Sequence, residues 1–477
     1  MQTYRLYFRC SVTKQMRCPV NAYQKCKALK MITTSGKFLT AFFTVFIFAT
    51  AVEKADAVGE SLFLDLEKTV ELAIKASPDL KKSKESIKAA QSAKKAYKTE
   101  FFPTFNSTYG YKRNDEPRYS IIPTVGLVQP RNEFAFTAGV SQPVFTGFSL
   151  TNQYKIAALG LESARLNEAL VRKEITFSAK LIYFSLLKTK KMAVIARGAV
   201  DQIEAHTRVA ENFHQVGMTP LNDLLKSKVE LANARQALIV SENNMEIAKA
   251  QLNLLLRRPL AAPIEIADIL DIGVLGLTIE QCMDAAKKNR LEILISEKEI
   301  QVREKEIALA KKDFYPSVDV AATYYKFGTD YDVDGGAGIS DSSSWDIQAR
   351  ASWDFWQWGK TGHTVAEKNR YLARAKIEKV DIMDKIALEV KEAWLKAREA
   401  QNNINAVQSA VDQAKEGFRI SEELYKEQMA TSTDVLDART LLSVTMTNYY
   451  NSIYDFGIAK AALDRAMGLP PGEKSDQ

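Results

Sequence analysis

Apolar residues recur at alternating spacings of four and three over 386–418, with Lys, Glu, Gln and Asn filling most positions between them. This spacing is typical of a coiled-coil helix. The stripe consists of Ile386, Val390, Ala393, Ala397, Ala400, Ile404, Val407, Val411, Ala414 and Phe418. A second stripe, in which Ser227 and Ser241 fill two gaps, consists of Leu224, Leu231, Ala234, Leu238, Met245, Ala248, Leu252 and Leu255. The patterns predict helices over 67–76, 79–100, 148–213, 221–257, 278–288, 291–313, 360–424 and 432–467.

Two halves of the chain share one pattern at an offset near 211 residues. Phe101-Phe102-Pro103 recurs as Phe314-Tyr315-Pro316, and Asn222-Asp223-Leu224-Leu225 recurs as Thr433-Asp434-Val435-Leu436. Each half combines short helices, two strands and a pair of long helices, and the prolines end the helices that precede the strands. We therefore predict repeat 1 at 58–262, repeat 2 at 263–470 and a polar tail at 471–477.

Four segments alternate apolar and polar residues with the period of a strand. We place these strands at about 103–113, 133–145, 316–327 and 345–358. The clearest alternation runs from Trp345 to Phe355, with Trp353 on the same face. Two soluble hairpins would explain the pattern, but apolar-out, polar-in strands with terminal aromatics are also typical of an outer-membrane barrel. Because four strands cannot close a barrel, several protomers would share one.

The N-terminal region has the features of an export signal. Residues 38–52 form a 15-residue apolar run that follows Lys37 and precedes small residues, which is the size of a secretory hydrophobic region. We predict a leader over 1–57 with cleavage after Ala57. Met31 begins a signal peptide of ordinary length (31–57), which leaves residues 1–30 as an upstream start-site artefact.

Charge and chemistry narrow the function classes. Of the 65 Lys and Arg residues, 9 lie in 1–57 with 2 of the 58 acidic residues, so the remainder is neutral overall and no nucleic-acid partner is expected. We expect no catalytic, cofactor-binding or metal-binding residues. His206, His214 and His363 are the only histidines, and none has ligand spacing, so we interpret them as surface helix positions.

The repeated arrangement resembles the TolC-type outer-membrane efflux protein family over nearly all of 60–470. The most specific residues are Asp434-Val435-Leu436-Asp437-Ala438, with Gly217 and Asp223-Leu224-Leu225 as the weaker first copy. The resemblance implies an α+β membrane protein, in which long coiled-coil helices form a periplasmic α-barrel and four strands per protomer contribute to a shared transmembrane β-barrel. It also implies a homotrimeric, passive exit duct that works with a periplasmic adaptor and an inner-membrane transporter.

By the same resemblance, Asp434 and Asp437 constrict the periplasmic entrance, and Asp223 and Tyr425 help to close it. The hairpin tips, which would dock the adaptor, contain Gly217, Thr219, Pro220, Thr431 and Ser432. Trp345, Trp353 and Phe355 would lie at the membrane interface against outer-membrane lipid. Two residues depart from the family pattern: Ala430 stands where an arginine would complete the closing network, and Gln428 replaces a tip glycine.

Two alternatives remain open on the residues alone. Asp434 and, less strongly, Asp437 follow Thr431, Ser432 and Thr433, so either could serve as a helix-capping residue. The whole chain could also be a periplasmic coiled-coil scaffold or adaptor without a pore. The cargo is not encoded in these patterns.

Overall fold

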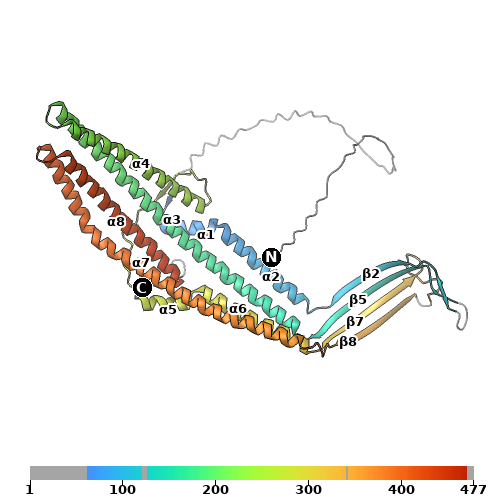
Figure 1. The fold of residues 1–477 in the computed structure, drawn as a ribbon. Coiled ribbons are helices and arrows are strands. Elements are labelled where there is room, and N and C mark those ends of the chain that lie inside the picture. Colours follow the sequence, from blue (N-terminus) through green and yellow to red (C-terminus); the bar gives the residue numbers. More distant parts are fainter. Residues whose placement is uncertain (1–61, 121–125, 340–341, 470–477) are drawn as a thin grey trace, which may run out of the picture. The chain divides into compact units, whose positions relative to one another are not determined.

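The computed structural model describes residues 62–120, 126–339 and 342–469 (Figure 1). The predicted leader (1–57) and the polar tail (471–477) lie outside the described residues. The description that follows concerns the unit that begins at Val58.

Eight helices of the described residues fall into two similar sets. The first set is α1 (Leu66–Ala76), α2 (Pro78–Thr99), α3 (Ser149–Gln215) and α4 (Leu221–Leu255). The second set is α5 (Ile279–Asn289), α6 (Leu291–Ala310), α7 (Lys360–Lys426) and α8 (Ser432–Met467), with a 3-10 turn, η1 (Lys311–Phe314), after α6. All eight helices begin and end within three residues of the bounds expected from the sequence.

Local signals explain several helix starts. Asp65 caps α1 by accepting a 2.7 Å hydrogen bond from the backbone N–H of Lys68, and Ser77 caps α2 ahead of Pro78. Thr278 and Gln281 form a capping box at the start of α5. Pro103 and Pro316 stand just before strands, so each proline separates a helix from the strand that follows it.

In each set, two shorter helices pack along one long helix. α2 and α4 both contact α3, and α6 and α8 both contact α7 (Figure 1). α3 and α7 each have 67 residues, which corresponds to roughly 100 Å at the rise of an α-helix. The long helix of each set therefore serves as a common support for the two shorter ones.

The strands form one four-stranded antiparallel sheet in the order β2-β5-β7-β8. Its members are β2 (Thr104–Arg113), β5 (Asn132–Thr146), β7 (Ser317–Gly328) and β8 (Ser343–Ser352). β8 ends at Ser352, so Trp353 and Phe355 follow the strand, and the expectation of a strand to residue 358 is wrong. The chain turns there towards α7, with Gln357 bonded to Asp354 and Gly359 at a φ of 80°.

Two small sheets complete the fold. β1 (Leu62–Leu64) pairs in parallel with β6 (Ile264–Ile266), which lies after α4. β3 (Arg118–Ser120) and β4 (Gly126–Gln129) pair antiparallel within the connection between β2 and β5. The main apolar core lies beneath β1 and β6, where Tyr183 and Tyr454 are fully buried and Tyr183 donates to the carbonyl of Ala267 at 2.6 Å.

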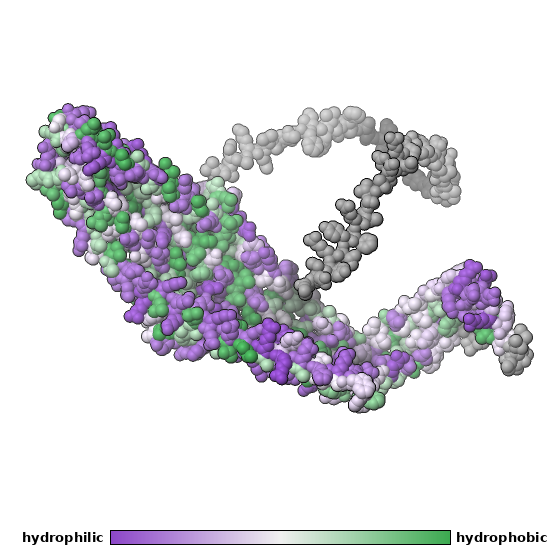
Figure 2. Space-filling view, viewed as in Figure 1, coloured by the Kyte–Doolittle hydropathy of each residue, from purple (hydrophilic) through white to green (hydrophobic). Residues whose placement is uncertain are grey.

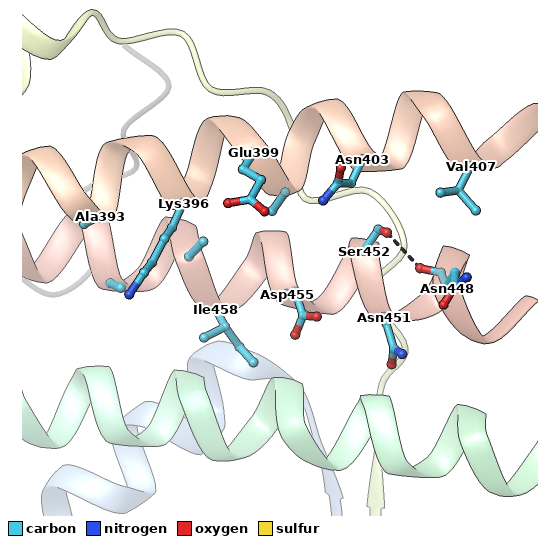
Figure 3. A pocket seen from close by; sticks show the side chains of 13 residues that line it. Ala393, Lys396, Glu399, Asn403, Val407, Asn448, Asn451, Ser452, Asp455 and Ile458 are labelled. Carbon is cyan, nitrogen blue, oxygen red and sulfur yellow. Dashed lines mark hydrogen bonds between the residues drawn. The ribbon is translucent and has the colours of Figure 1, made fainter. Parts of the chain in front are cut away.

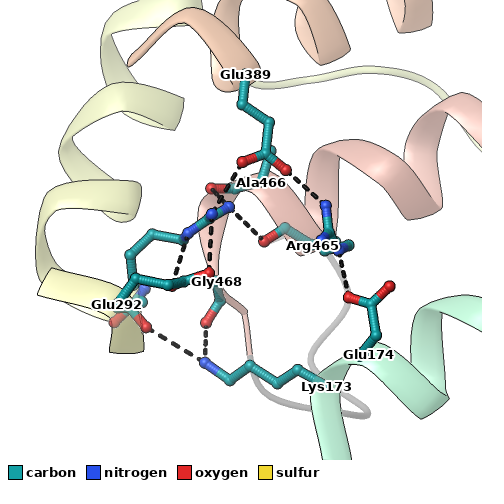
Figure 4. Close-up of polar contacts among 9 residues, drawn as sticks. Lys173, Glu174, Glu292, Glu389, Arg465, Ala466 and Gly468 are labelled. Atoms are coloured by element: carbon teal, nitrogen blue, oxygen red, sulfur yellow. Dashed lines mark hydrogen bonds and ion pairs between the residues drawn. The ribbon is translucent and has the colours of Figure 1, made fainter. Parts of the chain in front are cut away.

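A charged cluster fixes the end of α8 (Figure 4). The Lys173 ammonium donates to the carbonyl oxygen of Gly468 at 2.6 Å. The buried Arg290 guanidinium donates to the carbonyl of Ala466 at 3.2 Å and to Glu389 at 2.8 Å. Glu389 also accepts from Arg465 at 2.6 Å. These cations satisfy carbonyls that a helix end leaves without partners, so α3, α6, α7 and α8 are held together at this point.

Candidate functional site: the hairpin tips and the strand sheet

The two helix hairpins end in equivalent turns. In the first tip, the N–H of Gly217 donates to His214 at 3.0 Å and that of Met218 to Phe213 at 2.8 Å. In the second tip, Gln428 and Met429 make the same two bonds to Tyr425 and Leu424 at 3.0 and 2.8 Å. Gln428 therefore takes over the backbone role of the glycine, although its φ of 59° is unfavourable for a residue with a side chain.

Asp434 takes part in capping α8, as its neighbours predict, but as the N3 residue of a capping box whose N-cap is Thr431. Its Oδ2 accepts hydrogen bonds from the backbone N–H and the hydroxyl of Thr431, both at 2.7 Å. The backbone N–H of Asp434 donates in return to Thr431 Oγ1 at 3.3 Å, which completes a capping box. The hydrogen bond from the Thr431 backbone, with that from its hydroxyl, lowers the pKa of Asp434. The carboxyl stays exposed and ionised, so capping does not remove its charge from the tip.

Asp437 lies one turn further along α8 and is also exposed. It lines a groove of about 430 Å³ between α4 and α8, whose floor includes Leu225, Val229 and Leu436. Lys226 bridges the groove by donating to the Thr433 hydroxyl at 3.2 Å. The two aspartates thus sit on the outer surface of the tip in one chain, with no cation side chain bonded to either among the described residues.

The predicted closing pair is close in space but not bonded. Tyr425 is buried between the rings of His206 and Phe213, with centroid distances of 4.6 and 5.7 Å. Burial, with a further contribution from the charge of Asp223, raises the pKa of Tyr425. The Tyr425 hydroxyl has no hydrogen-bond partner in the described part of the chain. Asp223 and Tyr425 are therefore neighbours without a direct hydrogen bond.

A buried polar cluster of His206, Ser227 and Ser432, which the sequence does not predict, lies directly behind the tips. His206 was expected at a helix surface, but it is 6% exposed. Its Nε2 lies 2.8 Å from the hydroxyl of Ser432, which lies 2.8 Å from the hydroxyl of Ser227. The expectation is wrong because α3 faces α4 and also meets α8, a helix more than 200 residues away. Ser227 at a position of the apolar stripe was the one signal in the sequence.

Ser432 also differs from its expected role. It was placed among the docking residues, but its side chain is fully buried in this chain. Gly217, Pro220 and Thr431 are exposed at the tips, and Thr219 is partly buried, with its carbonyl 3.1 Å from His214 Nδ1. The accessible surface of the tips therefore comes from the turn residues and not from Ser432.

The sheet has one apolar and one polar face, because paired residues in neighbouring strands point the same way. Cross-strand pairs such as Tyr109–Phe136 and Tyr324–Trp345 belong to the apolar face, whereas Asp319–Arg350 belongs to the polar face. The polar face also carries Asn106, Thr108, Lys112, Thr137, Thr323, Asp346 and Gln348. Trp345, Trp353 and Phe355 are all mostly exposed. A large aromatic surface therefore remains uncovered in the single chain.

The helices carry a further exposed apolar stripe. On α4, Val240, Ile247 and Leu254 recur every seven residues, and each is more than half exposed. On α7, Ile377, Leu388 and Leu395 are similarly exposed. Figure 2 shows hydrophobic surface, in green, interspersed with hydrophilic surface, in purple, along the helices. These positions lie outside the stripe that packs within each hairpin.

A groove of about 650 Å³ separates α7 from α8 further from the tips (Figure 3). Small residues, among them Ala393 and Ala459, leave the space open, and the walls carry Lys396, Glu399 and Asp455. Charges of both signs and several amides line it, so no single class of ligand is favoured.

Across residues 62–120, 126–339 and 342–469, no group of His, Cys, Asp and Glu side chains is arranged to hold a metal ion. None of the helices in those ranges combines the length and the hydropathy needed to cross a membrane.

The chain thus combines two similar hairpins of long helices with a four-stranded sheet that has one apolar and one polar face. The model of the family described as "Outer membrane efflux protein" matches residues 69–256 and 282–469. The chain therefore belongs to the outer membrane efflux protein family. This confirms the TolC-type resemblance and places the protein among efflux channels of the outer membrane with long periplasmic helices. The family and the fold are those of channels rather than of enzymes.

Individual relatives are distant. The outer membrane efflux protein BepC of Brucella suis biovar 1 (strain 1330) is 19% identical over 378 residues, which cover 79% of this chain and 78% of that protein. The Campylobacter jejuni CmeC outer membrane channel has a TM-score of 0.74 at 16% identity, covering 86% of this chain and 87% of that one. VceC of Vibrio cholerae has a TM-score of 0.72 at 18% identity, covering 84% and 96%. These structures share the fold.

Proposed function

We propose that three copies of this chain form a passive exit duct, in which four strands per copy close a shared transmembrane β-barrel. The observation that carries the proposal is the sheet itself. It has an apolar face, a polar face and two edge strands, β2 and β8, that are paired on one side only among the described residues. Exposed edges seek further strands, and closure into a barrel removes them.

Strand direction supports closure between copies. The sheet contains an even number of antiparallel strands, so β2 and β8 run in opposite directions. β8 of one copy can therefore pair antiparallel with β2 of the next around a closed ring. The apolar face would then contact outer-membrane lipid and the polar face would line water.

The exposed apolar residues on α4 and α7 support a helical barrel in the periplasm, built by the same three copies as the β-barrel. Val240, Ile247 and Leu254 of α4, at seven-residue spacing, fit the seam between neighbouring coiled-coil helices, and α7 adds the exposed apolar residues Ile377, Leu388 and Leu395. In this arrangement each copy contributes the helices of both hairpins to one wall. Burial of these stripes between copies would supply stabilisation that a single chain lacks.

We assign the periplasmic entrance to the hairpin tips. Asp434 and Asp437, repeated by symmetry, would form negative collars that attract and retain cations. Asp223 and Tyr425 would contribute to closing the entrance. Gly217, Thr219, Pro220 and Thr431 would meet a periplasmic adaptor, with the α4–α8 groove beside them. An inner-membrane transporter would supply both cargo and energy.

Planar-bilayer recording tests the proposal. Detergent-extracted protein should insert and give discrete conductance steps, because a closed barrel with a polar interior conducts ions. A matched control replaces Trp345 and Ile347 on the apolar face with aspartate, which should abolish insertion, since charges facing lipid are costly. Absence of steps from the unmodified protein would contradict a pore.

A further inference from the structure

The buried polar cluster behind the tips joins the two hairpins. His206 lies on α3, Ser227 on α4 and Ser432 on α8, while Tyr425 of α7 packs against the His206 ring. The cluster therefore receives a residue from each of the four long and tip-forming helices. His206, Ser227 and Ser432 are 6%, 0% and 0% exposed.

The hydrogen bonds can be arranged as one chain in which each hydroxyl donates once. Ser227 Oγ donates to the carbonyl of Asp223 at 3.1 Å. Its oxygen then accepts from Ser432, whose own oxygen accepts from His206 Nε2–H. This assignment fixes the neutral tautomer of His206. The chain runs from α3 through α8 to the first turn of α4, and it ends at the residue assigned to entrance closing.

The position of this hydrogen-bonded chain between the two hairpins gives it a role beyond local packing. Apolar contacts connect helices in the same region, among them Leu224, Phe418 and Val435, but they tolerate sliding because they have no fixed direction. A hydrogen bond in a dry site requires one geometry, and breaking it leaves a buried polar group without a partner. Separation of the two tips would break the His206–Ser432 and Ser227–Ser432 bonds and leave both hairpins otherwise intact.

We propose that the His206–Ser432–Ser227 chain is the latch that holds the two hairpins together in the closed entrance, and that opening requires its rupture. The proposal rests on the assignment of the tips as the entrance. It gives the protein a closing contact of its own, at a tip where Ala430 supplies no cation and the Tyr425 hydroxyl has no hydrogen-bond partner among the residues that the structure describes.

A reversible cross-link tests the latch. The Ser227 and Ser432 hydroxyls are 2.8 Å apart, so Ser227→Cys with Ser432→Cys places two thiols within reach of a disulfide. Cys282, which is buried and free, is replaced by alanine in every variant. Oxidised full-length protein in planar bilayers should conduct no more than the parent. Reduction should raise the mean conductance about fivefold above the parent, as expected for loss of one net hydrogen bond.

Single substitutions provide the control. Ser432→Ala removes both bonds across the hairpins and should raise the mean conductance at least as much, without any reductant. Ser452→Ala is the matched control, because the Ser452 hydroxyl donates only to the carbonyl of Asn448 within its own helix, and it should leave conductance unchanged. Equal conductance of Ser432→Ala and Ser452→Ala, or no response of the double-cysteine protein to reduction, would overturn the latch. A parent protein that never conducts would instead overturn the proposed function, and the latch with it.

Discussion

Gly217 and Gln428 occupy equivalent places in the two hairpin tips, and both adopt a left-handed backbone conformation, with φ values of 76° and 59°. The Gln428 amide also donates to the Met218 sulfur at 2.9 Å, which ties one tip to the other. A residue with a side chain thus keeps a turn that a glycine forms without strain.

We predict that Gly217→Ala lowers the apparent free energy of unfolding by about 1 kcal/mol, the cost of a left-handed conformation for alanine. Gln428→Gly should change it less, because relief of strain is offset by the lost contact with Met218. Denaturant titration in detergent, followed by circular dichroism, measures both. Equal destabilisation by the two substitutions would contradict the equivalence of the turns.

The two aspartates assigned to the entrance, Asp434 and Asp437, should differ in their effects on cation block and on stability when each is replaced by asparagine. Asp437→Asn should weaken block by multivalent cations in planar bilayers without changing stability, because the side chain is exposed and makes no capping bond. Asp434→Asn should weaken block and also destabilise α8, because it weakens the capping box. Unchanged block in the double variant would remove both residues from the constriction.

Block of the duct by multivalent cations that depends on Asp434 should persist in mild acid. Its hydrogen bonds lower the pKa in the folded protein, so the capping contribution is present above the ordinary aspartate pKa and is lost only as the pH falls through the lowered value. In the Asp437→Asn variant, block by multivalent cations should therefore still be present near pH about 4, the ordinary range for aspartate. Loss of block well above that pH would contradict the capping geometry.

The entrance should open more readily at acid pH. Burial lowers the pKa of His206, and the charge of Glu422 on α7 partly opposes this. Of the other groups around the cluster, Tyr425 packs on the ring, and the charge of Asp223 acts on Tyr425. An opened tip would return the imidazole to its ordinary pKa of about 6.5. The open state then binds more protons, so acidification below that value favours opening.

Conductance measured between neutral and acid pH should therefore rise as the pH falls through that range. His206→Gln is the control, because the amide preserves neutral hydrogen bonding and does not titrate. An undiminished pH response in His206→Gln would assign the effect to another group.

Close packing of α3 on α8 gives a stability test away from the tips. A Cβ added to Gly457 would lie 2.7 Å from Cε1 of Phe184, so Gly457→Ala should destabilise the protein by about 1–3 kcal/mol through overpacking. Gly417→Ala is the matched control in α7, where nothing lies within 4 Å of the added atom. It should stabilise by about 0.5–1 kcal/mol. The same sign of effect at both sites would contradict the helix contact.

Much of the fold follows from local pattern. Helix periodicity, the stops before Pro103 and Pro316 and the duplicated motifs predict the helices, since these signals depend on neighbouring residues. The end of β8 was placed too late because aromatic alternation continues through Trp353 and Phe355 after the hydrogen-bonded ladder stops at Ser352. The alternation of apolar and polar residues indicates which way side chains point, but it does not indicate where the hydrogen bonds between strands end.

Only part of the candidate site can be predicted from the sequence, because some of its contacts are local and others join distant helices. The capping role of Asp434 could be anticipated, because Thr431 is three residues away. The burial of His206 and Ser432 could not, because it depends on the meeting of α3 with α8 across more than 200 residues. Periodicity identifies the face of a helix but does not identify which distant helix covers it.

The mass of the detergent-solubilised particle tests the central claim most directly. Native mass spectrometry of the extracted protein should give three times the mass of one mature chain, because in the proposed duct the edges of β2 and β8 pair with neighbouring copies. A stable particle with the mass of a single chain would leave both edges unpaired and would contradict the account.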